Sequence, residues 1–111
     1  MYIAIVQIPG VSRTREEAIT SGLASAGKFA GLDGLKTKYY LNGEQGGGGV
    51  YIWESRAKAE AFYNDDWWPM MEKAFGVRPS LTCYDNHLVV DNEADEVRLE
   101  GKKVDPGQAA A

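Results

Sequence analysis

The sequence predicts a single α+β domain whose elements follow the order strand, helix, strand, strand, helix, strand. Short segments rich in β-branched residues alternate with helical patterns, and glycines or prolines separate them. A chain of 111 residues is long enough to bury one core and too short for two comfortable ones. This order is that of a ferredoxin-like βαββαβ fold, in which both helices cover one face of an antiparallel sheet.

The first strand and helix are predicted from local signals near the N-terminus. Residues 2–8 are mostly β-branched or apolar and end before a Pro-Gly pair, which is typical of a strand followed by a turn. Thr14 and Glu17 have the spacing of a capping box, which marks a helix start. Apolar residues then recur at helical spacing until Gly31, so we expect a helix over residues 15–30.

Two strands joined by a glycine-rich hairpin are expected next. Residues 35–41 alternate in part, and the run 46–49 precedes the apolar segment 50–53, so this glycine run is interpreted as a flexible turn. The first of these strands lies at an edge of the predicted sheet. Lys36 and Lys38 are therefore interpreted as solvated charges that discourage edge pairing, with a functional lysine as the alternative.

The second half of the chain predicts further helical segments and a last strand. Ser55 is placed to cap a helix that continues to residue 63, and a further helical stretch follows from Pro69 to about residue 75. The last predicted strand covers residues 81–90. We expect the domain to occupy residues 1–91.

Residues 92–111 are predicted to form a polar tail or arm, because their sequence is polar and mixed in charge. Val97, Leu99 and Val104 are the apolar residues through which this segment could dock as a short edge strand.

Composition excludes several classes of function. A formal net charge of −4 gives no attraction to nucleic acid or to anionic lipid. Cys83 is the only cysteine and lies outside any Cys/His cluster, so neither an internal disulfide nor a structural zinc site is expected. The apolar segment 2–8 lacks the preceding basic residues of a signal peptide, and no run approaches the length of a membrane span. We therefore expect a cytoplasmic protein without a metal or a cofactor.

The two predicted central strands are apolar on both faces, although one face of such a sheet has no helices. A half-solvated antiparallel sheet should instead alternate apolar and polar residues. The uncovered face therefore needs a partner, and a second copy of the sheet would supply it, which predicts a homodimer. The residues concerned are Ile3, Ala4, Ile5, Val6 and Ile8 in the first strand and Val50, Tyr51, Ile52 and Trp53 in the third.

A recognisable pattern is formed by Gly34-Leu35, by Lys38, by the segment 48–55 and by the helix 57–63. In these residues the sequence resembles the YdhR-type monooxygenases of the dimeric α+β barrel superfamily, and the match extends over roughly residues 2–91. It implies two ferredoxin-like subunits with paired sheets and a pocket between sheet and helices in each.

The activity that this resemblance implies is cofactor-independent oxygenation of a small aromatic, phenolic or quinone-like compound. Related members of the superfamily bind small ligands without catalysis, handle haem or act as isomerases, and these remain the alternatives.

The candidate substrate-binding residues are aromatic. Tyr51 and Trp53 share one face of the third strand, with Tyr40 on the neighbouring strand, and they either stack on a planar substrate or fill the core. Trp67 and Trp68 are adjacent and cannot both face one core. One of the two is expected to line a pocket mouth or the dimer seam, with a buried and a surface indole as the alternative.

His87 is the candidate catalytic base, because its unperturbed pKa lies near neutrality. The alternative is a surface histidine near a strand end. A haem-handling function would use the same residue as an iron ligand.

Overall fold

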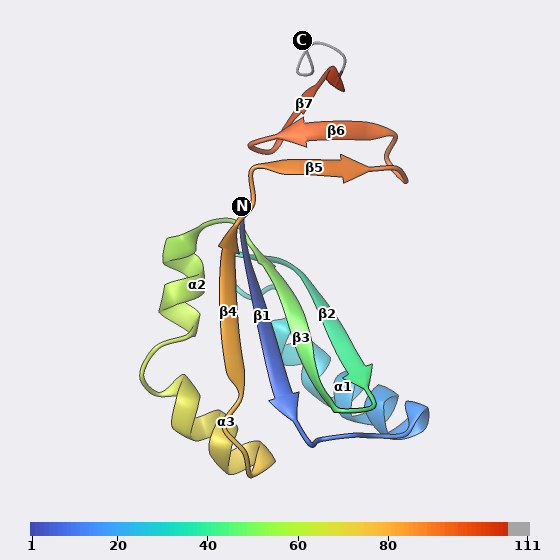
Figure 1. Cartoon of the computed structure of the whole chain (residues 1–111). Helices are drawn as coiled ribbons and strands as arrows, with labels where there is room; N and C mark the ends of the chain where they lie inside the picture. Colours follow the sequence, from blue (N-terminus) through green and yellow to red (C-terminus); the bar gives the residue numbers. More distant parts are fainter. Residues whose placement is uncertain (107–111) are drawn as a thin grey trace.

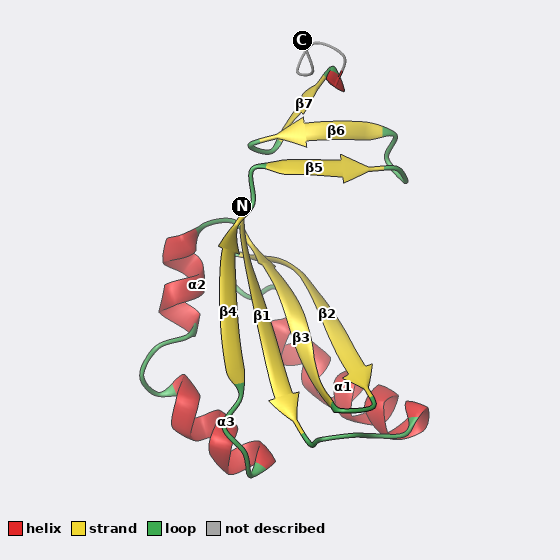
Figure 2. Cartoon of the chain, in the orientation of Figure 1, coloured by secondary structure: helices red, strands yellow, loops and turns green. Residues whose placement is uncertain are grey.

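The computed structural model describes residues 1–106, which form two antiparallel sheets and three helices. The α+β class predicted from the sequence is therefore confirmed. Figures 1 and 2 show the helices beside the larger sheet and a small second sheet near the C-terminus. The elements are β1 (Tyr2–Pro9), α1 (Arg15–Phe29), β2 (Leu35–Gly43), β3 (Gly46–Trp53), α2 (Arg56–Phe62), α3 (Trp67–Phe75), β4 (Ser80–Asp85), β5 (Leu88–Asp91), β6 (Glu96–Leu99) and β7 (Lys102–Val104).

The larger sheet has the strand order β2-β3-β1-β4, and each neighbouring pair is antiparallel. Ala4 of β1 lies opposite Tyr51 of β3 on one side and Cys83 of β4 on the other. The buried residues of β1 and β3 pack against Phe29 of α1 and Ala59 of α2. All three helices therefore cover one face of this sheet, which we call the helix face, and the opposite side is the open face (Figure 1).

Helix ends follow the local signals in the sequence. The capping box is present, since the Glu17 N–H donates to Thr14 Oγ1 (3.2 Å) and the Thr14 N–H donates to Glu17 Oε1 (2.9 Å). Ser55 caps α2 by accepting from the Lys58 N–H, and Gly76 ends α3 in the left-handed conformation. Within residues 1–106, no helix has the length and apolar content needed to cross a membrane.

The strand predicted over residues 81–90 is wrong, because the chain turns at Asn86 and His87. β4 ends at Asp85, and β5 begins at Leu88 in the second sheet. The last rung of the first sheet joins Asn86 to Met1, with the Asn86 N–H donating to the Met1 carbonyl (2.8 Å). The Asn86 side chain then donates to the carbonyl of Leu88 (3.3 Å), which holds the chain in the turn.

The second sheet is a meander of β5, β6 and β7, which we call the C-terminal meander. β6 and β7 lie in the segment predicted as a polar tail, whose residues 107–111 are outside the described part of the chain. The meander extends beyond the end of the larger sheet (Figure 1). The radius of gyration is accordingly 16.1 Å, whereas a compact domain of this length has about 13 Å.

The two faces of the meander differ. One carries Val90, Val97 and Val104 in register, and the other carries Arg98, which forms ion pairs with Asp91 (3.2 Å) and Glu96 (2.5 Å).

The centre of the open face is apolar, whereas its margins carry exposed polar side chains such as Thr37 and Thr82. Ile3 of β1 pairs with Ile52 of β3, while Tyr39 and Tyr84 are 58% and 54% exposed. A register shift between Leu35 and Thr37 in β2 sets which side chains reach this face. Tyr39 therefore lies on the open face opposite Val50, and Lys38 lies on the helix face.

Candidate functional site

A cavity of about 710 Å³ lies on the helix face, between the sheet, α1 and α3, and we call it the helix-face cavity. Its walls and base are mainly apolar and include Ile19, Leu23, Met70, Val6 and Ile8. Leu23 is 73% exposed, and Ile19 and Met70 are 44% and 43% exposed. Apolar side chains that surround an open space instead of packing against one another are typical of a ligand site.

The glycine run shapes the base of this cavity. The sequence predicted a flexible turn, but Gly46–Gly49 belong to β3 and the turn lies at residues 44 and 45. At Gly48, where φ is +148°, a Cβ would lie 1.9 Å from the Val6 carbonyl oxygen, so only glycine allows β1 and β3 to pair. A Cβ at Gly49 would lie 3.3 Å from Cε of Lys38. The run therefore leaves room for the Lys38 side chain.

Lys38 points into the helix-face cavity and is half-buried. Its Nζ lies 3.5 Å from the ring centroid of Phe29, 3.9 Å from that of Tyr40 and 4.9 Å from that of Tyr51. Burial, with a smaller contribution from Lys28, lowers the pKa of Lys38 to about 8. Among residues 1–106, no carboxylate forms an ion pair with this ammonium, so three aromatic rings are its closest protein partners.

The charges that line the cavity are all positive. Arg13, Lys28 and Lys38 are among the lining residues, and the described lining contains no aspartate or glutamate. This local excess is opposite in sign to the net charge of −4 of the whole chain. The cavity is therefore electrostatically suited to an anion.

Tyr40 supplies a hydroxyl at the side of the cavity. Its Oη lies 2.9 Å from Oγ of Ser25, and Ser25 Oγ donates to the carbonyl of Gly22 (3.1 Å). Because the serine proton is used in that bond, the Tyr40 hydroxyl donates to Ser25. An oxygen lone pair of Tyr40 is then left to accept from a bound ligand.

Tyr51 lies between the cavity and the packed core. Its ring is stacked on Trp53 at a centroid distance of 6.3 Å with 7° between the planes, and it also lines the cavity. Burial raises the pKa of Tyr51, so its hydroxyl stays protonated near neutral pH. Trp53 is 1% exposed and donates from Nε1 to the Tyr63 hydroxyl (3.3 Å). Of this stacked pair, only Tyr51 reaches the cavity.

Trp67 and Trp68 divide between core and surface. Trp67 is buried against Tyr63, with ring centroids 5.1 Å apart, and it does not line the helix-face cavity. Trp68 is half-buried, and the guanidinium of Arg78 lies 4.4 Å from its ring centroid. The structure therefore brings Tyr40 and Tyr51 together at the cavity and places Trp53 and Trp67 in the core.

His87 lies away from the cavity. It occupies the exposed turn between β4 and β5, and its imidazole Nδ1 pairs with the carboxylate of Glu100 at the start of the turn before β7. This turn adjoins the end of the sheet that contains Tyr2, whereas the cavity is built around Val6 and Ile8 (Figure 1).

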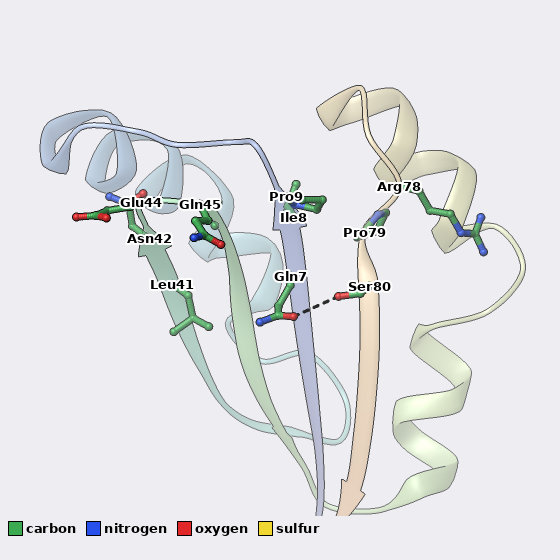
Figure 3. Close-up of a pocket in the computed structure, with 13 residues that line it drawn as sticks. Gln7, Ile8, Pro9, Leu41, Asn42, Glu44, Gln45, Arg78, Pro79 and Ser80 are labelled. Atoms are coloured by element: carbon green, nitrogen blue, oxygen red, sulfur yellow. Dashed lines mark hydrogen bonds between the residues drawn. The ribbon is translucent and has the colours of Figure 1, made fainter.

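A second hollow, of about 790 Å³, lies at the end of the sheet where β1 and β2 finish and β3 and β4 begin (Figure 3). Several of its polar side chains already have partners within the protein. Ser80 donates to Gln7 (3.4 Å), and Arg78, which points away from this pair, is bonded to Glu72 (3.0 Å). The helix-face cavity, with its unpaired ammonium, is therefore the stronger candidate site.

Comparisons with known proteins add no assignment. No protein-family model matches the sequence, and no curated protein matches it significantly. Within residues 1–106, no three or more His, Cys, Asp or Glu side chains are grouped so that they could hold a metal ion.

From the sequence, Lys38 is interpreted as a solvated edge charge with a functional lysine as the alternative, and His87 is the candidate base with a surface histidine as the alternative. The alternation of residues 38–40 could have indicated the position of Lys38 at the cavity. Successive side chains of a strand point to opposite faces, so Lys38 lies on the same face of β2 as the candidate Tyr40. The register shift after Leu35, which sets the direction of that face, has no clear signal in the sequence.

Proposed function

We propose that this chain is a cofactor-independent monooxygenase that acts on a small phenolic or quinone-like compound bound in the helix-face cavity. The observation that carries the proposal is the cavity itself, which combines a largely apolar lining and aromatic side chains with three cationic groups. Its volume of about 710 Å³ lies in the range of small-molecule sites. The sheet order β2-β3-β1-β4 with helices on one face supports a ferredoxin-like fold, and the resemblance to YdhR-type monooxygenases favours the same activity.

The reaction requires an electron-rich substrate, because its anion must itself reduce dioxygen. A hydroxyanthrone is a suitable example, since conversion of its CH₂ group by O₂ to a carbonyl releases one water and needs no further reductant. The protein must bind the flat rings, favour the ionised substrate and exclude water. Tyr51 offers a ring face to the cavity, and the Tyr40 hydroxyl offers an acceptor.

Oxygen uptake with 1,8-dihydroxyanthrone, 1-naphthol and a quinol tests this proposal, with a metal chelator present and no flavin added. We expect uptake above the spontaneous rate. Leu23→Trp, which would fill the cavity, should abolish the excess, whereas Ala24→Trp on the same helix but outside the cavity should retain it. Uptake that equals the spontaneous rate for every compound would contradict the proposal.

A non-catalytic ligand-binding protein is the second candidate. The described lining contains neither a histidine nor a carboxylate, which are the commonest proton acceptors of enzymes, and this leaves Lys38, with a pKa of about 8, as the candidate acceptor. Saturable binding of 1-naphthol without oxygen uptake would favour this candidate.

We also propose that two copies form a dimeric α+β barrel through their open faces. The exposed Tyr39 and Tyr84 and the apolar Ile3–Ile52 pair support this, because such a face is normally covered. A hollow of about 840 Å³ between this face and the C-terminal meander offers further surface to a partner. Sedimentation should give about twice the chain mass of 12.2 kDa, and Ile5→Lys should give monomers. A monomeric wild-type protein would contradict this proposal.

A further inference from the structure

The charged groups of the helix-face cavity suggest which ligands it selects. Phe29, Tyr40 and Tyr51 place three rings around Nζ of Lys38, at centroid distances of 3.5, 3.9 and 4.9 Å. All three aromatic residues also line the cavity, so they offer apolar contact to a flat aromatic ligand beside the ammonium. Arg13 and Lys28 add positive charge at the same cavity, and the described lining has no carboxylate to balance it.

We infer that Lys38 is the residue that selects ligands by charge, and that the helix-face cavity takes flat aromatic anions whose ionised oxygen binds the Lys38 ammonium. The inference deepens the proposed function, on which its assignment of a phenolate as the reacting species rests. The ammonium would act on the substrate as a binding group and would stabilise the phenolate from which an electron passes to O₂.

The environment of Lys38 makes a large effect plausible on physical grounds. Attraction between opposite charges is several times stronger at a half-buried site than in water. A charge-assisted hydrogen bond to an oxyanion would also give the ammonium the partner that it lacks within residues 1–106. A neutral aromatic ligand of the same shape would gain only the stacking and the apolar contact.

When the ligand is a phenol, Lys38 can also accept its proton. Its hydroxyl proton passes to the neutral Lys38 amine, which leaves a phenolate and an ammonium in contact and conserves charge. Burial, and then Lys28, lower the pKa of Lys38 to about 8, so a fraction of the amine is neutral near physiological pH. Arg13, Lys28, Tyr40 and Tyr51 are the other charged or titratable groups of the lining, and α3 contributes none to it.

The first experiment compares two ligands of matched shape, 2-naphthoate and 2-naphthamide, by calorimetric titration of the full-length protein at pH 7. We expect 2-naphthoate to bind at least about tenfold more tightly. Lys38→Met should remove this preference and leave 2-naphthamide binding within about twofold. Lys36→Met removes an exposed lysine from the same strand, so it should retain the preference.

The pH dependence of binding provides a second readout. The affinity for 2-naphthoate should be constant between about pH 6, where the carboxylate is still ionised, and about pH 8. It should weaken above pH 8, because the free protein then loses the Lys38 proton. The affinity for 2-naphthamide should not change with pH over this range. A charge preference that persists in Lys38→Met would overturn the inference, as would equal affinity of the wild-type protein for the two ligands.

The phenol is tested by absorbance of 1-naphthol mixed with the protein. We expect the naphtholate band to appear at a lower pH than in buffer, and this shift in pH should be lost in Lys38→Met. A band that appears at the same pH as in buffer would show that Lys38 does not stabilise the phenolate. Selective binding of anions without oxygen uptake would support this inference and contradict the proposed oxygenase. Oxygen uptake that is unchanged in Lys38→Met would support the oxygenase and contradict the role of Lys38.

Discussion

The two halves of the helix face are built on the same strands but are filled differently. Next to α2, Trp53 is 1% exposed and packs on Phe62 and Tyr63 with ring centroids 5.3 and 5.7 Å away. Next to α1, glycines replace side chains on β3, and Leu23 is 73% exposed. The first half holds the fold together, and the second keeps a cavity open. The difference shows that large side chains fill the sheet–helix layer next to α2, whereas next to α1 the glycines of β3 leave the surrounding large side chains without a filled centre.

The largest expected effect is a difference in the free energy of unfolding lost when a large side chain is truncated in each half of the helix face. Trp53→Ala should lower the free energy of unfolding by about 3–5 kcal/mol, because it empties a buried indole site. Leu23→Ala, a deletion of apolar atoms in the hollow half, should change it by no more than about 0.5 kcal/mol. Urea denaturation of both variants tests this contrast. Equal losses would show that the α1 half is packed in solution.

The next largest effect is the change in the free energy of unfolding when a glycine is replaced by alanine. Gly49→Ala would place a Cβ 3.0 Å from Cε1 of Tyr51 and 3.3 Å from Cε of Lys38, so it should lower the free energy of unfolding by about 1–3 kcal/mol. Gly27→Ala is the control, since nothing lies within 4 Å of its added Cβ in α1. That variant should gain about 0.5–1 kcal/mol from helix propensity. The same denaturation measurement applies, and a gain for Gly49→Ala would contradict the crowded site.

A smaller effect depends on pH. Lys38 has a pKa of about 8 in the folded protein, lowered by burial from its ordinary value of 10.5. The unfolded chain therefore binds more protons between these values, and the contribution of Lys38 to the free energy of unfolding rises with pH across this window. Below about pH 8 the full cost of holding the buried charge is present.

Lys38→Met removes that cost. Allowing for solvent screening and for attraction to the aromatic rings, we expect the variant to be more stable than the wild type by about 1 kcal/mol at pH 7. The difference should shrink as the pH approaches 10.5. Thermal unfolding at several pH values measures it, with Lys36→Met as the exposed control. A difference that does not depend on pH would contradict the burial of this ammonium.

The smallest effect concerns the hydroxyl of Tyr40. Tyr40→Phe removes its hydrogen bond to Ser25 and keeps the ring beside Lys38, so the free energy of unfolding should fall by only about 0.5 kcal/mol.

Tyr39→Phe on the open face should have no measurable effect on ligand binding. Loss of binding in Tyr39→Phe would place the ligand on the wrong face of the sheet.

The parts of the fold that depend on local sequence could be predicted. The capping box of Thr14 and Glu17, the cap at Ser55 and the glycine that ends α3 each act within a few residues. The break after β4 could not be predicted in the same way, because it depends on pairing between Asn86 and Met1, which are far apart in the chain.

The candidate site was predicted only in its aromatic part. Tyr51 and Trp53 alternate on one strand, but which of them reaches a cavity depends on where α2 packs, and that is a property of the whole fold. The role of Lys38 likewise depends on the register shift in β2 and on the position of Phe29 in α1.

The most direct test of this account is to map a bound ligand onto the two halves of the helix face by NMR. With 2-naphthoate added, the methyl resonances of Leu23 and Met70 should shift, while the indole Nε1–H of Trp53 should not. Shifts at Trp53 without shifts at Leu23 or Met70 would contradict the central claim, which is that the α1 half of this face holds the ligand.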